Sequence, residues 1–185
     1  MTVELSNTLD IVRKSLNGTT SRYERSKIGQ FFTPAMIARY MASLFQHAGQ
    51  EVRILDPGAG TGVLFASFVE ALVSREERPL SITVVAYEND KAVFPHLKDT
   101  IERCWIICKN AGISFRGEIK SEDFVTSAIV QSNEGPFATR SERFTHAILN
   151  PPYKKISSDS ACADHSTWRG LRSPTFMLRL CGSQL

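Results

Sequence analysis

Short apolar runs, each followed by a polar or glycine-rich segment, set the pattern of this chain. The runs predict four β-strands, at residues 52–55, 82–86, 113–119 and 144–149. Apolar residues at helical spacing predict helices at 5–16, from Pro34 to about Gly49, from Val63 to Leu72 and from Lys91 to Ala111. Because strands and helices alternate, we expect a parallel α/β sheet whose ligands lie outside the carboxyl ends of its strands.

Two of these helices carry more specific expectations. Thr33 and Pro34 are typical of an N-cap followed by proline at the first helical position. The apolar positions of that helix are Ile37, Met41, Leu44 and Phe45. In the helix at 91–111 one face is predicted to hold Val93, Leu97, Ile101, Trp105 and Cys108.

Composition narrows the class of protein. The 185 residues are 42% hydrophobic and 22% charged, which is close to average globular usage and predicts a buried core. No run reaches the roughly 18 apolar residues of a membrane span, and the N-terminus does not resemble a signal peptide, so we expect a cytoplasmic protein with no membrane partner. The four cysteines lack metal-ligand spacing, so no metal site is expected, and Cys104 and Cys108 predict two thiols on one helix face.

The net charge of +3 comes from residues 151–185, which hold five basic and two acidic side chains. The first 150 residues are neutral. Affinity for nucleic-acid phosphates comes mainly from clustered Lys and Arg. A basic DNA-holding surface is therefore not expected in the first 150 residues.

Two features follow the first two predicted strands. Asp56 ends the first strand, and Gly58, Gly60 and Gly62 then let the backbone turn tightly and approach a ligand closely. Such a loop is also found in dinucleotide-binding proteins and in plain structural turns. Glu88 ends the second strand, where an acid can accept from both hydroxyls of a ribose. Asp90 could serve instead, and a solvated acid or a helix cap is the commoner fate of an acid there.

Two further features follow the last two strands. Asp123 could accept from an exocyclic amine and Phe124 could cover a base, although a loop acid beside a core phenylalanine is equally consistent. The sharper signal is Asn150-Pro151-Pro152-Tyr153. The side-chain oxygen of Asn150 and the carbonyl of Pro151 can accept from both hydrogens of an adenine amino group and free its delocalised lone pair. The proline rings fix φ at both positions, and Tyr153 offers a face for a flipped-out base.

The order of these motifs is similar to that of a known family. GQFFTP (29–34), DPGAGTG (56–62), YEND (87–90), EDF (122–124) and NPPY (150–153) resemble the N6-adenine-specific DNA methyltransferases of restriction–modification systems, in the gamma order. The resemblance covers about Ser26 to Ile156. It implies a Rossmann-like class I methyltransferase sheet with strand order 3-2-1-4 and flanking helices. It also implies methyl transfer from S-adenosylmethionine to N6 of a flipped-out adenine in double-stranded DNA.

The resemblance assigns roles residue by residue. It implies that Phe32, Thr33 and Pro34 hold the methionine end of the cofactor. Asp56, Gly58 and Gly60 would line the cofactor. Glu88 would bind its ribose, and Asp123 with Phe124 would bind its adenine. The target adenine would be held by Asn150, Pro151, Pro152 and Tyr153.

The resemblance also divides the chain. We expect an N-terminal helical segment at 1–25, a partial catalytic core at 26–156 and an atypical tail at 157–185. The tail is consistent with a frameshift between about Ser160 and Pro174. The target-recognition domain and the later strands of the sheet are expected to be missing, which would leave the strand of Ile148 as a bare apolar edge. A linked or separate restriction endonuclease would be a partner.

Alternatives remain at this point. Protein-glutamine and RNA methyltransferases also use Asn-Pro-Pro-Tyr or close variants, although the motif at 29–34 favours DNA. A truncated chain could instead be a non-catalytic remnant that binds S-adenosylmethionine weakly or not at all. A nicotinamide-binding domain is a more distant alternative, because it leaves residues 150–153 without a purpose.

Overall fold

The four predicted strands form one sheet in the computed structural model, which describes residues 33–46, 49–124 and 143–150 together with 5, 7–9, 11, 12 and 127. The strands are β1 (Glu51–Asp56), β2 (Ser81–Tyr87), β3 (Ser114–Lys120) and β4 (His146–Ala147). Their order is β3-β2-β1-β4, and all three pairings are parallel. The predicted α/β fold class and the strand order 3-2-1-4 are confirmed.

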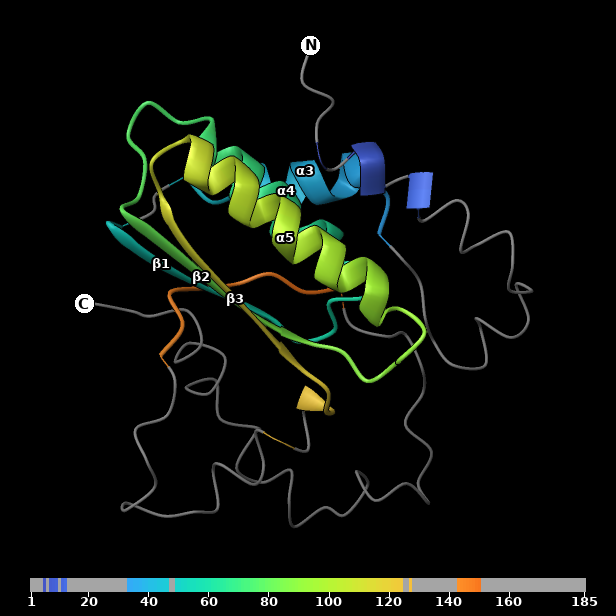
Figure 1. Ribbon diagram of the computed structural model, residues 1–185. Coiled ribbons are helices and arrows are strands. Elements are labelled where there is room, and N and C mark those ends of the chain that lie inside the picture. Colours follow the sequence, from blue (N-terminus) through green and yellow to red (C-terminus); the bar gives the residue numbers. More distant parts are fainter. Residues whose placement is uncertain are drawn as a thin grey trace, which may run out of the picture.

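Three helices cover one face of this sheet, namely α3 (Ala35–Ser43), α4 (Val63–Val73) and α5 (Phe94–Asn110) (Figure 1). The chain steps from β1 to β2 to β3 in one direction, and right-handed crossovers therefore place α4 and α5 on the same side. The step from β3 to β4 runs in the opposite direction. The strand order thus reverses between β1 and β4.

The core lies between these helices and the sheet. Helix α4 packs against α3, α5 and β1, and its largest buried side chains are those of Phe65, Phe68 and Leu72. Because it is covered on several sides, α4 is apolar around most of its circumference. The helical residues Leu5 and Leu9 also join this core. A smaller apolar cluster, which holds Leu55, Val85, Tyr87, Phe124, Phe144 and Ala147, is separate from it.

The face that α3 buries matches the prediction in part, since Met41 and Phe45 pack against the core. Ala35, Ala38 and Ala42 are buried, whereas Ile37 and Leu44 are 48% and 61% exposed. Small side chains let α3 approach α4 closely, and larger ones would hold the two helices apart. The helix also ends at Ser43, before Gly49. Its N-cap is Pro34 and not Thr33, and no side chain caps it.

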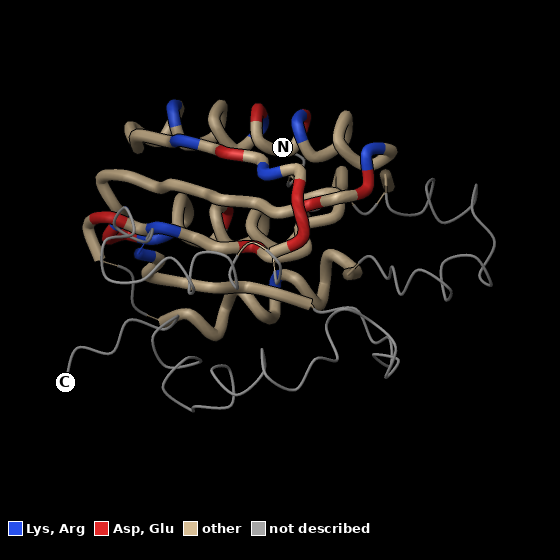
Figure 2. Tube along the Cα trace, turned by 90° about the horizontal axis from the view of Figure 1, so that it is seen from below, with Lys and Arg blue, Asp and Glu red and all other residues tan. Residues whose placement is uncertain are grey.

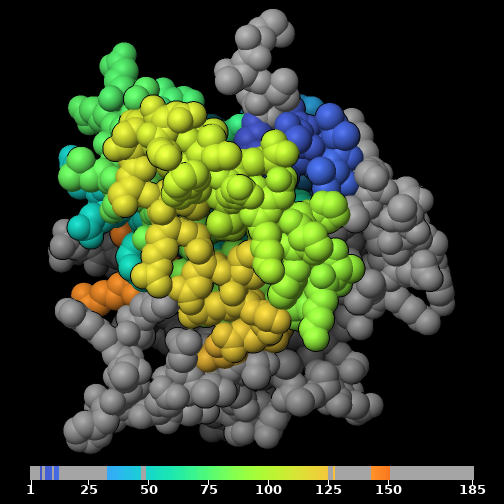
Figure 3. All heavy atoms as spheres, viewed as in Figure 1, coloured from blue at the N-terminus to red at the C-terminus, as the bar shows by residue number. Residues whose placement is uncertain are grey.

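Helix α5 buries most of the predicted face, since Val93, Leu97 and Cys108 are buried and Ile101 packs against the core. Trp105 is the exception, at 46% exposure, and Thr100 and Cys104 are buried instead. Three successive steps of four from Val93 to Trp105 drift around a helix of 3.6 residues per turn, which carries Trp105 out of the buried face. Figure 3 shows α5 on the surface of the molecule beside β3. There the ammonium group of Lys109 lies 4.7 Å from the centroid of the Trp105 ring.

The two thiols predicted to share one helix face do so. Cys104 and Cys108 are both buried and free, and burial raises the pKa of the Cys108 thiol to about 12. None of the helices in the described part of the chain combines the length and apolar character that a bilayer crossing requires. The same residues contain no cluster of three His, Cys, Asp or Glu able to hold a metal ion.

Strand β4 is shorter than the predicted run at 144–149. The N–H of Arg53 donates to the hydroxyl of Thr145 at 2.8 Å, so a side chain takes the place of a main-chain acceptor. The main-chain ladder resumes where the N–H of Ile148 donates to the carbonyl of Leu55. Within the described residues β4 is an edge strand of the sheet, as expected. The side chain of Ile148 is buried, at 2% exposure, and that of Leu149 is 43% exposed. The tail at 157–185 and most of the segment at 1–25 lie outside the described residues.

Candidate active site

The carboxyl ends of three strands bring the predicted site residues to one edge of the sheet. Asp56 is the last residue of β1, Glu88 follows β2, and Asn150 lies just beyond β4. Since β1 lies between β2 and β4, Asp56 is central. In open parallel sheets, ligands bind at such an edge where the strand order reverses, and here it reverses between β1 and β4.

The glycine loop is held by its own backbone conformation. Gly60 and Gly62 have φ values of 55° and 85°, which side chains rarely tolerate. A Cβ at Gly62 would lie 2.6 Å from the ring of Phe65. Gly58 has no positive φ, and a Cβ there would meet nothing within 4 Å. Neither backbone conformation nor packing therefore requires glycine at position 58, and its missing side chain leaves open space beside the loop.

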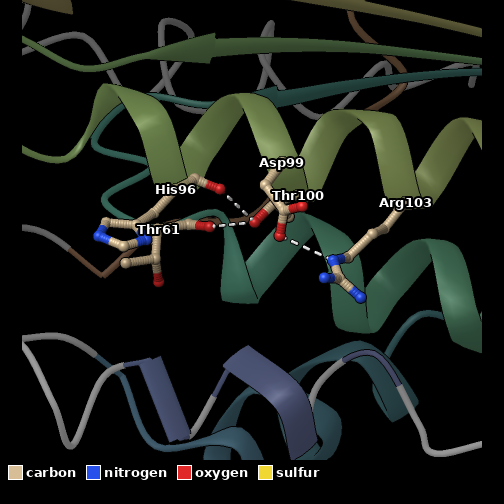
Figure 4. A network of polar contacts seen from close by, with 5 residues as sticks. All are labelled: Thr61, His96, Asp99, Thr100 and Arg103. Atoms are coloured by element: carbon tan, nitrogen blue, oxygen red, sulfur yellow. Dashed lines mark hydrogen bonds and ion pairs between the residues drawn. The ribbon is translucent and has the colours of Figure 1, made fainter.

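A threonine of helix α5 forms a hydrogen bond with the glycine loop (Figure 4). The hydroxyl of Thr100 donates to the carbonyl of Thr61 at 2.7 Å and also lies 2.9 Å from the carbonyl of His96. Thr100 is fully buried, so water cannot replace this bond. Asp99 and Arg103 form an exposed ion pair on the same helix, at 2.7 Å. The sequence analysis did not single out Thr100, because nothing in a single helical threonine indicates a loop partner.

Asp56 has a buried carboxyl group whose oxygens lack hydrogen-bond donors in the described part of the chain. Its exposure is 0%, and neither oxygen has a partner with hydrogen-bond geometry among the described residues. Burial raises the pKa of Asp56 to about 8, the nearby Phe65 amide lowers it somewhat, and the charge of Glu88 raises it further. A buried anion without a partner is costly. The site therefore favours a cationic or hydrogen-bond-donating ligand at the end of β1.

Glu88 joins the ends of β1 and β2. Its Oε2 accepts from the Gly60 N–H at 2.8 Å, and its Oε1 accepts from the N–H groups of Asn89 and Asp90 at 2.9 and 2.8 Å. Its carboxylate is thus fixed in direction, and Oε2 still has one lone pair for a further donor. Asp90 instead accepts from the N–H of Ala92, at the turn that leads to α5. This contact lies in the turn before α5, whose N-cap is Val93 with no side-chain cap. Glu88 instead contacts the glycine loop at Gly60, so it is the better candidate for a ribose.

Phe124 follows β3 at the carboxyl edge of the sheet. Its ring meets that of Tyr87 edge to face, with 5.1 Å between centroids, and it belongs to the cluster of Leu55 and Val85. Asp123 is exposed. Tyr87 is part of the motif at 87–90, but the sequence analysis assigned it no role of its own. Its position as the last residue of β2 could have indicated that it contacts Phe124.

The most distant motifs in the sequence meet here. The Nδ2 of Asn150 donates to the hydroxyl of Thr33 at 3.1 Å, although 117 positions separate the two residues. Thr33 is buried and Asn150 is half-buried. The other residues expected at this side, Phe32, Pro151, Pro152 and Tyr153, lie outside the described residues.

These features fit S-adenosylmethionine in their donor chemistry. The unpaired carboxyl group of Asp56 suits an ammonium group, the open space at Gly58 suits close approach, and the remaining lone pair of Glu88 suits a hydroxyl. The cofactor assignments of individual residues stay predictions. Charged residues of both signs are interspersed over the described part of the chain in Figure 2, with no basic face visible in that view.

Comparisons with known proteins agree with these observations. The family described as N-6 DNA Methylase matches residues 16–175, so the match begins before Ser26 and continues past Ile156. The chain is 34% identical over 160 residues to Type II methyltransferase M.BsuBI of Bacillus subtilis and 31% identical over 159 residues to Type II methyltransferase M.PstI of Providencia stuartii. These matches cover 85% and 84% of this chain but only 30% of each relative.

Among solved structures, a type I restriction–modification system methyltransferase subunit from Streptococcus thermophilus is similar at 18% identity, with a TM-score of 0.43. That similarity covers 74% of this chain and 26% of the other. The family match is much broader, since it runs over most of the 185 residues. The chain therefore belongs to the N-6 DNA methylase family.

Proposed function

We propose that this chain carries the cofactor-binding and catalytic part of an adenine-specific DNA methyltransferase of a restriction–modification system. The observation that carries the proposal is the convergence of Asp56, Glu88 and Asn150 at one edge of the sheet, beside the reversal of strand order, in a member of the N-6 DNA methylase family. The two Type II methyltransferases that the chain resembles support the same proposal.

The cofactor would be S-adenosylmethionine, which supplies a methyl group activated by its sulfonium. Asp56 would accept from the ammonium group of the methionine part, and Gly58 and Gly60 would let the backbone lie against the cofactor. Glu88 would accept from a ribose hydroxyl with the lone pair of Oε2 that Gly60 leaves unused. Asp123 and Phe124 would hold the adenine, and Phe32, Thr33 and Pro34 the methionine end.

The target adenine would be held by residues 150–153. The Oδ1 of Asn150 and the carbonyl of Pro151 would accept from the two hydrogens of the adenine amino group and localise the lone pair on its nitrogen. The two proline rings would hold these acceptors in place, and Tyr153 would stack on the base. S-adenosylmethionine would supply the methyl group to this nitrogen, and the surplus proton on the nitrogen would pass to solvent water. Positioning accounts for most of such a step.

Sequence-specific contact with double-stranded DNA would come from a recognition domain outside these 185 residues. The mixed charge of the described surface supports this division of labour (Figure 2). A linked or separate restriction endonuclease would be a functional partner. The proposal implies a cytoplasmic site of action, where bacterial DNA and the cofactor are found.

Cofactor binding is the first test. Calorimetry on the full chain should give a Kd in the micromolar range for S-adenosylmethionine, and Asp56→Asn should weaken it by at least roughly tenfold. Asp99→Asn is a matched control, because Asp99 is an exposed acid paired with Arg103 and should leave binding unchanged. Equal binding by all three chains would contradict the proposed role of Asp56.

Methyl transfer is the second test. Mass spectrometry of duplex DNA incubated with the chain and S-adenosylmethionine should detect N6-methyladenine, and Asn150→Ala should abolish it. RNA and a glutamine-containing protein substrate serve as competing acceptors in the same assay. Transfer to either of these acceptors and not to DNA would overturn the proposed substrate.

A further inference from the structure

One hydrogen bond connects the two sides of the proposed site. The Nδ2 of Asn150, beyond β4, donates to the hydroxyl of Thr33, which lies before α3. Thr33 is only 6% exposed, so its hydroxyl is well shielded from water. A shielded acceptor holds its donor in one orientation better than an exposed one.

The backbones on both sides of this bond are restricted in the same way. Thr33 precedes Pro34 and Asn150 precedes Pro151. A residue before proline is excluded from the helical region by the proline ring. Pro34 itself is extended, with φ −62° and ψ 144°. Each side chain therefore projects from a constrained backbone, and the bond joins two points with little freedom to drift.

An asparagine amide has two unlike ends, and the NH₂ end is the one bonded to Thr33 in this structure. The NH₂ end can only donate, and the Oδ1 end can only accept. With Nδ2 bonded to Thr33, Oδ1 is the end left for a ligand's donor. We propose that Thr33 is a positioning residue that holds the side chain of Asn150 at the proposed site, with its Oδ1 available to the target amino group.

This inference rests on the proposed function, in which Asn150 accepts from adenine. It goes beyond the cofactor role expected for Thr33, and the two roles are compatible. A threonine hydroxyl that accepts from Asn150 still has its own hydrogen to donate, for instance to a cofactor carboxylate. Thr33 would then contact both sides of the site.

The direct test follows the side-chain amide of Asn150 by ¹⁵N NMR on the full chain without cofactor. Its signals are identified by their loss in Asn150→Asp. In Thr33→Val, which keeps the shape but removes the hydroxyl, the amide hydrogens should exchange with solvent several times faster. Thr33→Ser should restore the slow exchange. Thr83→Val, the same change in the middle of β2, should leave these signals unchanged.

The kinetic test uses the same variants in the methyl-transfer assay. Thr33→Val should lower kcat by roughly tenfold while KM for the cofactor changes less, and Thr33→Ser should recover most of kcat.

Two results would overturn the inference. One is unchanged amide exchange in Thr33→Val. The other, which needs no substitution at Thr33, is a wild-type Asn150 amide that exchanges as fast as the amide of Asn110, an exposed residue at the end of α5. If the wild-type chain binds the cofactor but transfers no methyl group, the proposed function fails while the NMR result still decides the role of Thr33.

Discussion

The two sides of the β1 carboxyl end are built differently. On the β2 side, Glu88 accepts from three backbone N–H groups, Thr100 donates to the glycine loop, and six consecutive residue pairs join β1 to β2. On the β4 side, two residue pairs join the strands. There, a side-chain hydrogen bond from Asn150 to Thr33 connects the end of β4 to the motif at residues 29–34.

The β2 side is built from residues close together in the sequence, whereas the β4 side is assembled from residues far apart in the sequence. The β2 side is formed within one βαβα unit, and its polar groups satisfy one another before any ligand binds. The β4 side needs a segment that precedes β1 by many residues and motif residues that follow Asn150. Substitutions on the β2 side should therefore alter the stability of the fold, whereas those on the β4 side should alter the proposed chemistry more than the stability.

The strongest test of this contrast is Gly62→Ala. The substitution forces a side chain into a φ of 85° and places its Cβ 2.6 Å from the Phe65 ring and 2.9 Å from Thr100. We expect the free energy of unfolding to fall by about 2–4 kcal/mol, from backbone strain and overpacking together. Urea denaturation of the wild-type and variant chains measures it.

Gly58→Ala is the matched control in the same loop. A Cβ there meets nothing within 4 Å and needs no positive φ, so the free energy of unfolding should change by less than about 0.5 kcal/mol. Its effect should fall on S-adenosylmethionine binding instead. Equal destabilisation by both variants would show that the loop is not divided into a structural glycine and a ligand-facing one.

Glu88→Gln should have the next largest effect. An amide has one acceptor oxygen, so either the Gly60 N–H or the N–H groups of Asn89 and Asp90 would face a donor. We expect a loss of about 1–3 kcal/mol in the free energy of unfolding, measured by urea denaturation. Asp90→Asn keeps its oxygen toward Ala92 and should cost less than about 1 kcal/mol. The reverse ranking would mean that Asp90 and not Glu88 organises this junction.

Apolar runs and glycine stops predicted the strands and three of the helices, because they are local signals, whereas the strand order came from the family resemblance. The pattern missed part of each buried helix face. In α3 the alanines pack inward and larger residues such as Ile37 remain exposed, since helix spacing decides what fits. Hydrophobicity ranks Ile37 above Ala38, and only the distance to α4 reverses that ranking.

At the site, the sequence identified the residue types but not their contacts with one another. It placed Asp56 and Glu88 correctly at the ends of neighbouring strands. It assigned the Thr33 side chain to a helix cap, whereas the structure directs that hydroxyl to Asn150. A contact between residues so far apart depends on how α3 and β4 pack, which no local pattern encodes. The supporting roles of Thr100 and Tyr87 were missed for the same reason.

The raised pKa of Asp56 gives an effect that accumulates with pH. The pKa of Asp56 is about 8 in the folded chain and its ordinary value is 3.8, so between these pH values the folded chain holds a proton that the unfolded chain has lost. The free energy of unfolding should therefore fall as pH rises, by at most about 1.4 kcal/mol per pH unit, and level off above about pH 8. Urea unfolding at several pH values should show this slope in the wild type and a flatter one in Asp56→Asn. Identical slopes would mean that Asp56 is ionised in the free protein.

The smallest effect is expected on the β4 side, from Thr145→Val. The substitution removes the hydroxyl that accepts from the Arg53 N–H at 2.8 Å, but Thr145 is exposed, so water can take its place. We expect a loss of about 0.5–1 kcal/mol in the free energy of unfolding, together with faster hydrogen exchange at the Ile148 amide, which bonds to Leu55 in the same short ladder. Thr83→Val controls for the change of residue type. A loss as large as that of Gly62→Ala would remove the contrast between the two sides, because β4 would then hold the sheet together as firmly as β2 does.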